Sequence, residues 1–146
     1  MPGVRVLIVD DEPDILDLLQ IWFGDDDRGA ALACYSQLDG VVEGAADFGP
    51  DAIVLDFWFG ARTSAGILRS LRTACPRATI FIHTASSRAA ISENVLSLGA
   101  DRVIEKASIG IDELVTCVLD AALVPAPTVI DLTTAEQTAG TTSSPS

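Results

Sequence analysis

Acidic side chains follow two apolar runs of this chain, and they are the residues best suited to chemistry. Asp10, Asp11 and Glu12 come directly after an apolar run near the N-terminus, and Asp56 ends a second run. Neighbouring carboxylates repel one another unless a cation joins them. Their hard oxygen atoms suit Mg²⁺, so a magnesium site is one interpretation. An acidic N-cap, supplied by Asp11 or Glu12 to a following helix, is the other.

Two further polar residues follow later apolar runs. Thr84 ends one run, and Lys106 comes shortly after another. Phosphoryl transfer requires positioning and neutralisation of charged oxygens more than it requires acid–base groups. A hydroxyl and an ammonium group supply such contacts, and a carboxylate nucleophile gives an aspartyl phosphate. These residue types favour phosphoryl transfer to Asp56, with Asp10 and Asp11 holding Mg²⁺ directly or through water.

These residues meet only if the apolar runs before them are strands of one sheet. A continuous apolar run without alternation is typical of a strand buried on both faces. The pattern predicts five strands, at residues 4–9, 30–35, 51–56, 79–84 and 102–104. It predicts helices at 14–26, from an N-cap at Ser36 to 48, from an N-cap at Ser64 to 75, at 88–98 and at 112–123.

Strands and helices therefore alternate five times in about 120 residues. Alternation of this kind implies right-handed βαβ crossovers. The expected fold class is α/β: a doubly wound, five-stranded parallel sheet with helices on both faces and strand order 2-1-3-4-5. In that order strands one and three are neighbours at the topological switch point. Asp10, Asp11 and Asp56 would then converge in one crevice, beside Thr84 and Lys106.

Composition limits the kind of protein. The net charge of −12 argues against direct nucleic-acid binding. No apolar run reaches the ~18 residues of a transmembrane helix, and the first strand follows Met1 too closely for a signal peptide. We expect a cytoplasmic protein with a folded domain at 1–124. Residues 125–146 read as a Pro/Thr/Ser-rich flexible tail, in which 128–130 could pair as an edge strand.

Two expectations concern apolar residues. The helix at 14–26 repeats apolar residues at three- and four-residue spacing, so we expect its inner face to be Ile15, Leu18, Leu19, Trp22 and Phe23. Because the apolar arc is broad and includes Leu16, the alternative is that its edges stay exposed and serve a partner helix. The three cysteines, Cys34, Cys75 and Cys117, are far apart and have no CxxC spacing. We expect them to be reduced, buried, small apolar residues.

The polar positions lie in segments that resemble a known family. The segments are VLIVDDEPDI (6–15), DAIVLD (51–56), TIFIHTAS (79–86) and GADRVIEK (99–106). From residue 4 to about 123 the chain resembles the receiver domain of two-component response regulators, which has the CheY-like, flavodoxin-like fold.

The resemblance implies a role for each site residue. Asp56 would accept a phosphoryl group from a histidine kinase phosphohistidine. Mg²⁺ would be bound by Asp11, Asp56 and the carbonyl of Trp58, with Asp10 joining through water. Thr84 and Lys106 would contact the phosphoryl oxygens.

The chain departs from the family pattern at several positions. Val103 stands where receivers usually carry an aromatic residue that rotates inward on phosphorylation, so the usual readout is in doubt. The loop after Asp56 contains three aromatic residues and two extra positions. Within it, we expect Phe57 and Phe59 to pack under helices, with Trp58 on the surface or covering the mouth beside Asp56. His83 replaces an aliphatic residue, and we expect it to bond a neighbouring carbonyl.

Two function classes remain open. The chain is either a phosphorylation switch, which is not an enzyme in the ordinary sense, or a phosphorylation-independent interaction module. The expected partner is a sensor histidine kinase or a histidine phosphotransfer protein, with no direct nucleic acid and no membrane. The face made by residues 88–123 is the usual dimer or output surface of the family, so a homodimer through it is a further expectation. A segment at 132–136 only faintly resembles the start of a helix-turn-helix domain.

Overall fold

The computed structural model describes residues 3–123. Five strands form the main sheet: β1 (Val4–Val9), β2 (Ala30–Tyr35), β3 (Ala52–Leu55), β6 (Thr79–Thr84) and β7 (Arg102–Glu105). Two short strands, β4 (Trp58–Phe59) and β5 (Arg62–Thr63), form a hairpin. The helices are α1 (Pro13–Asp25), α2 (Val41–Phe48), α3 (Ala65–Ala74), α4 (Arg88–Leu98) and α5 (Ile111–Leu123).

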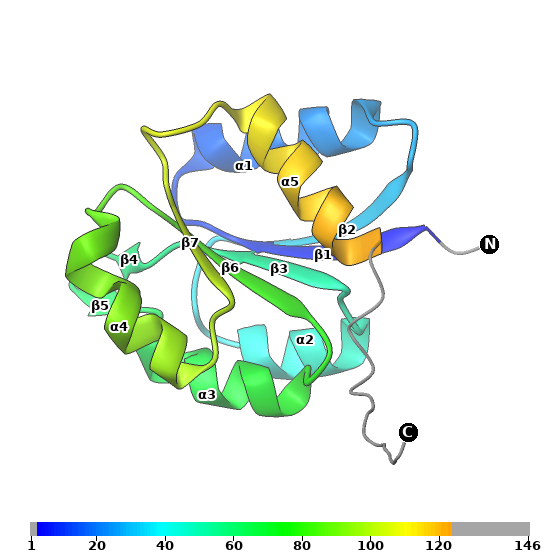
Figure 1. Cartoon of the computed structure of the whole chain (residues 1–146). Coiled ribbons are helices and arrows are strands. Elements are labelled where there is room, and N and C mark those ends of the chain that lie inside the picture. Colours follow the sequence, from blue (N-terminus) through cyan, green and yellow to red (C-terminus); the bar gives the residue numbers. More distant parts are fainter. Residues whose placement is uncertain (1–2, 124–146) are drawn as a thin grey trace, which may run out of the picture.

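The main sheet is parallel throughout, with the order β2-β1-β3-β6-β7. Since β4 and β5 lie outside it, this is the predicted order 2-1-3-4-5, and the predicted fold class is confirmed. Helices α1 and α5 cover one face of the sheet, and α2, α3 and α4 cover the other (Figure 1). The chain therefore forms three layers.

Strand β1 shows why a continuous apolar run is needed at the centre of such a sheet. Its neighbours β2 and β3 pair with it on both sides. Leu7 and Val9 point into the core under α2, α3 and α4, while Val6 and Ile8 point into the core under α1 and α5. All four side chains are fully buried. Alternate residues thus serve opposite cores, and neither face tolerates a polar side chain.

The prediction for α1 is wrong about its inner face. Leu19 and Phe23 are fully buried, but Leu18 and Trp22 are 41% and 43% exposed. The two buried residues are four positions apart and lie on one stripe of the helix. Leu18 and Trp22 lie beside that stripe, and Trp22 lines a surface pocket together with Val115 and Thr116 of α5. The broad apolar arc therefore extends beyond the core.

The predicted start of α2 is also wrong. The helix begins at Val41 rather than after Ser36, which is exposed and caps nothing. Leu38 is buried in the core, and its carbonyl accepts a hydrogen bond of 3.2 Å from the N–H of Val41. Gly40 has φ +79°, a conformation that favours glycine. The turn that precedes α2 therefore buries the side chain of Leu38 in the core before the helix begins.

Two smaller differences concern Cys34 and the loop after Asp56. Cys34 is exposed rather than buried, because β2 is an edge strand; Cys75 is buried and Cys117 is half-buried. The segment predicted as a loop after Asp56 contains the β4–β5 hairpin. Gly60 lies between these two strands with φ +63°, so the chain can reverse there. The segment 128–130 and the tail lie outside the described residues.

Candidate functional site

The site lies at the carboxyl ends of β1 and β3. These strands are neighbours, with Val9 paired to Leu55, and the N–H of Asp56 donates to the carbonyl of Val9 at 2.8 Å. The pairing brings the residues that follow both strands to one edge. Carboxylate oxygens of Asp10, Asp11 and Asp56 lie within 4.8 Å of one another. Asp10 and Asp56 are buried, and Asp11 is exposed to solvent.

Lys106 reaches into this acidic cluster from the loop after β7. Its Nζ lies 3.1 Å from Asp10, 2.5 Å from Glu12 and 3.2 Å from Asp56. The side chain of Lys106 is only 14% exposed, so its ammonium group neutralises carboxylates that burial has removed from water. The sequence analysis did not assign Glu12 to the site.

Glu12 occupies the N-cap position of α1, but its side chain makes no capping hydrogen bond. Its carboxylate accepts a hydrogen bond from Lys106 Nζ instead. The N-cap interpretation is therefore wrong for this side chain. The two residues are 94 positions apart, and no local sequence pattern indicates such a contact.

Burial and repulsion make Asp56 the most perturbed carboxyl of the site. Its pKa rises from 3.8 to about 7, because burial and then the charge of Asp10 disfavour its ionised form. The pKa of Asp10 is raised too, chiefly by burial. Burial works against the charge on Lys106, but the hydrogen bond to Glu12 and the charges of Asp10 and Asp56 raise the pKa of Lys106. A further cation beside Asp56 would therefore favour its ionised form.

The two oxygens of Asp56 have different partners. Oδ1 accepts a hydrogen bond of 2.8 Å from the N–H of Phe57, and Oδ2 accepts one of 3.2 Å from Lys106 Nζ. These contacts fix the carboxylate at the strand end. Asp10 and Asp11 offer further carboxylate oxygens close to those of Asp56.

Thr84 lies at the carboxyl end of β6, the strand next to β3. Its side chain is fully buried, and its Oγ1 accepts a hydrogen bond of 3.0 Å from the N–H of Ser86. Accepting this bond leaves the hydroxyl proton free to donate elsewhere. The carbonyl of Thr84 also accepts a hydrogen bond of 2.6 Å from the N–H of Lys106. The backbones of Thr84 and Lys106 are thus tied together.

Trp58 links the loops that follow β3 and β6. Its indole Nε1 donates to the hydroxyl oxygen of Ser86 at 2.7 Å. Its ring stands edge-on to Phe57, with centroids 5.2 Å apart and planes at 90°. Phe57 is buried and Phe59 is half-buried, while Trp58 is 46% exposed, as the sequence analysis expected of the three aromatics. Ser86 was not predicted as a partner of this loop.

His83 and Val103 are both buried near the site. Nδ1 of His83 has no hydrogen-bond partner among residues 3–123, and no bond from its ring to a carbonyl is found there. The expected carbonyl contact is therefore wrong. Burial, followed by the charge of Lys106, lowers the pKa of His83 to about 4, so the ring is neutral at pH 7. Val103 is 7% exposed and belongs to the core under α2, α3 and α4.

The residues at the site fit a divalent cation. Three converging carboxylates are hard oxygen ligands, as Mg²⁺ and Ca²⁺ require. The carbonyl of Trp58, two residues beyond Asp56, is a further oxygen on the same loop.

Comparison with known proteins identifies the family. The model for the response regulator receiver domain matches residues 6–119. The chain belongs to this family. Receiver domains are signalling domains that interact with histidine kinases or phosphotransfer proteins, and phosphorylation on aspartate is general among them. No curated protein sequence matches the chain.

Solved structures share the receiver fold at low sequence identity. A CheY-like receiver domain from Methanospirillum hungatei JF-1 is 18% identical, with a TM-score of 0.73 over 83% of this chain and 94% of that chain. The response regulator domain of Thermotoga maritima CheB is 21% identical, with a TM-score of 0.71 over 86% and 100%.

A response regulator from Burkholderia pseudomallei is 20% identical, with a TM-score of 0.70 over 82% of this chain and 69% of that chain. It was solved with a phosphorylated aspartic acid, a calcium ion and citrate.

Within residues 3–123 of the present receiver domain, every helix is too short or too polar to cross a bilayer.

Proposed function

We propose that this receiver domain accepts a phosphoryl group on Asp56 from the phosphohistidine of a sensor histidine kinase or a histidine phosphotransfer protein. One observation carries the proposal: Asp56 is buried where the carboxylates of Asp10 and Asp11 and the ammonium of Lys106 converge. A carboxylate surrounded by cation ligands and an ammonium group is suited to receive a negatively charged group.

In the proposed step, an Asp56 carboxylate oxygen attacks phosphorus and forms a new P–O bond. The P–N bond to the donor histidine breaks, and its electron pair stays on the imidazole nitrogen. Lys106 then binds a phosphoryl oxygen, and the Thr84 hydroxyl donates to another. Asp10, Asp11, Asp56 and the Trp58 carbonyl would hold Mg²⁺, which supplies neutralisation of charge on the phosphoryl oxygens.

The readout of phosphorylation is proposed to be atypical. Val103 has no ring to rotate, and a β-branched side chain has few rotamers. It is already buried in the core, so its movement would have to displace packed neighbours. We infer that the signal instead reaches the surface through the loops held by Thr84 and Lys106, whose backbones are hydrogen-bonded.

The alternative is an interaction module that does not need phosphorylation. Val103 is the observation that favours it, because the usual aromatic switch is absent at that position.

The main proposal has three other features: a folded domain at 1–124 with a flexible tail at 125–146, a cytoplasmic location and a homodimer through the 88–123 face. Contacts with nucleic acid or membrane are not part of the proposed function.

The deciding experiment is incubation with Mg²⁺ and a small phosphodonor, or with beryllofluoride, followed by intact-mass analysis. We expect one phosphoryl adduct on the wild-type chain and none on Asp56→Asn. Emission from Trp58 should respond to Mg²⁺, and a Trp22→Phe variant removes the background from the other tryptophan. No adduct on the wild-type chain, or an equal adduct on Asp56→Asn, would reject the switch and favour the interaction module.

A further inference from the structure

Glu12 and Lys106 form the shortest ion pair of the site. Nζ of Lys106 lies 2.5 Å from Glu12, against 3.1 Å from Asp10 and 3.2 Å from Asp56. The side chain of Glu12 is 56% exposed, whereas those of Asp10 and Asp56 are 3% and 7% exposed. An ammonium group has three N–H donors. That of Lys106 is therefore shared between one carboxylate at the surface and two in the interior, and it lies closest to the one at the surface.

The backbone of Glu12 is held in place at the start of α1. Its N–H donates to Oδ1 of Asp10 at 2.9 Å, and its carbonyl accepts a hydrogen bond of 3.1 Å from the N–H of Leu16. Pro13 follows directly, and a residue before proline is restricted to extended conformations. Glu12 has φ −89° and ψ 112°, as this restriction requires. Its side chain therefore projects from a fixed point beside the site.

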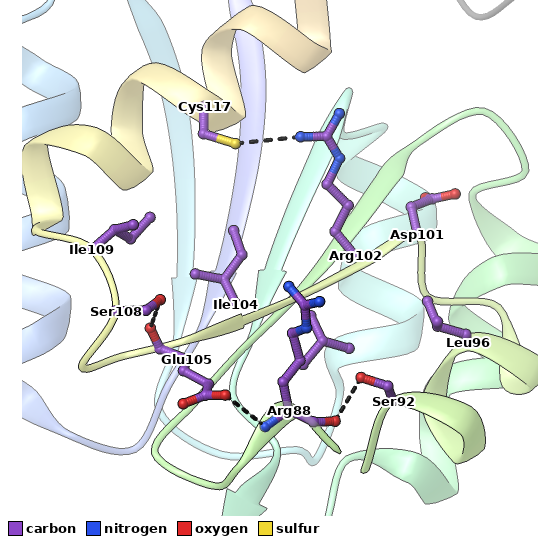
Figure 2. A pocket seen from close by; sticks show the side chains of 11 residues that line it. Arg88, Ser92, Leu96, Asp101, Arg102, Ile104, Glu105, Ser108, Ile109 and Cys117 are labelled. Carbon is purple, nitrogen blue, oxygen red and sulfur yellow. Dashed lines mark hydrogen bonds between the residues drawn. The ribbon is translucent and has the colours of Figure 1, made fainter. Parts of the chain in front are cut away.

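The loop that contains Lys106 is held as well. The preceding residue, Glu105, lines a groove of about 660 Å³ that runs along β7 between α4 and α5 (Figure 2). The carboxylate of Glu105 accepts a hydrogen bond of 2.9 Å from the backbone N–H of Arg88, and its carbonyl accepts one of 2.8 Å from the Ser108 hydroxyl. Because both backbones are held, loss of the Glu12 carboxylate should move the ammonium group rather than the loops.

The two buried carboxylates attract the ammonium group and a divalent cation alike. Asp10 and Asp56 belong to the three acids whose oxygens converge within 4.8 Å. Electrostatic attraction is stronger in a buried site than at the surface, where water and salt screen it. Without a carboxylate on its outer side, the ammonium group should therefore settle between Asp10 and Asp56. It would then occupy oxygens that the cation needs.

We propose that Glu12 is a positioning residue for Lys106, whose ammonium group it draws outward so that Asp10 and Asp56 remain available to a divalent cation. Glu12 is not one of the three converging acids, so it acts through Lys106 rather than as a cation ligand. The inference deepens the proposed function, because it concerns the same metal site. Its tests contain no phosphodonor, so their failure differs from a missing phosphoryl adduct on Asp56.

The first test observes Lys106 directly. It is the only lysine in the chain, so protein labelled with [¹³C]lysine gives a single CεH₂ signal by nuclear magnetic resonance. In metal-free protein, Glu12→Gln should shift this signal, because the ammonium group moves toward the buried acids. Asp14→Asn is the matched control, since Asp14 is exposed in the first turn of α1, and it should leave the signal in place. An unshifted signal in Glu12→Gln, or an equal shift in Asp14→Asn, would overturn the proposal.

The second test measures Mg²⁺ affinity by calorimetric titration at pH 8. Glu12→Gln should weaken Mg²⁺ binding roughly five- to tenfold, a size typical of coupling between residues in contact. Asp14→Asn should weaken it by less than about twofold, because exposed charges are screened. In a Lys106→Met background, which has no ammonium group at the site, Glu12→Gln should have no larger effect than Asp14→Asn.

Two results of this titration would overturn the proposal. An unchanged Mg²⁺ affinity in Glu12→Gln would mean that the bond to Lys106 only ties two loops together. A loss that persists in full in the Lys106→Met background would mean that Glu12 acts on the cation through its own charge. The lysine signal requires only the single variants, so it tests the proposal even if Lys106→Met does not fold.

Discussion

Replacing Asp56 by asparagine should stabilise the metal-free protein at high pH. The carboxyl group is 5% exposed and lies beside Asp10, and these two causes raise its pKa from 3.8 to about 7. A carboxyl whose pKa is raised on folding stabilises the native state while it is protonated. That stabilisation is fully present below pH 3.8 and is lost as the pH rises through about 7. Asparagine stays neutral at every pH, so the variant does not lose stability in this way.

The expected size follows from the difference between the two pKa values. At 1.36 kcal/mol per pH unit, a rise of about three units corresponds to roughly 4 kcal/mol. Asparagine also changes the hydrogen bond that Oδ2 accepts from Lys106, and the pKa of about 7 already includes the attraction of Lys106 for the ionised carboxylate. We therefore expect the stability of Asp56→Asn relative to wild type to increase by about 2–4 kcal/mol between pH 4 and pH 8.

The assay is urea unfolding with a chelator present, at several pH values from 4 to 8. Asp17→Asn, which removes an exposed carboxylate from α1, is the matched control. Adding Mg²⁺ should stabilise wild type more than Asp56→Asn, because the cation joins the carboxylates. A difference that is independent of pH, or that shrinks as the pH rises, would refute the argument that burial and Asp10 penalise the ionised form of Asp56.

Three further outcomes are expected. Trp58→Asn should shorten the half-life of the acyl phosphate several-fold in a dephosphorylation assay, because the ring and its bond to Ser86 no longer restrict the access of water to Asp56. An unchanged or longer half-life would count against this prediction, and so would an equal effect of Trp22→Asn. Lys106→Met should cost about 3 kcal/mol of metal-free stability at pH 8, since it leaves buried acids unpaired; unchanged urea unfolding would contradict it. Phe81→Ala should cost about 3–5 kcal/mol in the same assay because the ring is fully buried, whereas the half-exposed Trp22→Ala should cost much less.

Local patterns in the amino-acid sequence are sufficient to predict the layers of the fold and the edge of the sheet where the acids lie. Continuous apolar runs identified the buried strands, because a strand covered on both faces needs apolar residues at every position. The handedness of βαβ crossovers left few topologies, so Asp10, Asp11 and Asp56 could be placed at neighbouring strand ends. These inferences depend on local periodicity and general chirality, which the sequence displays directly.

The contacts between distant segments cannot be read from such local patterns. The bond from Lys106 to Glu12 joins residues 94 positions apart, and the bond from Trp58 to Ser86 joins residues 28 apart. The exposure of Leu18 and Trp22 likewise depends on how α1 sits against its neighbours. Side-chain partners of this kind depend on how elements pack, and the packing is a property of the whole domain. The groove along β7 exists for the same reason: α4, β7 and α5 create it together.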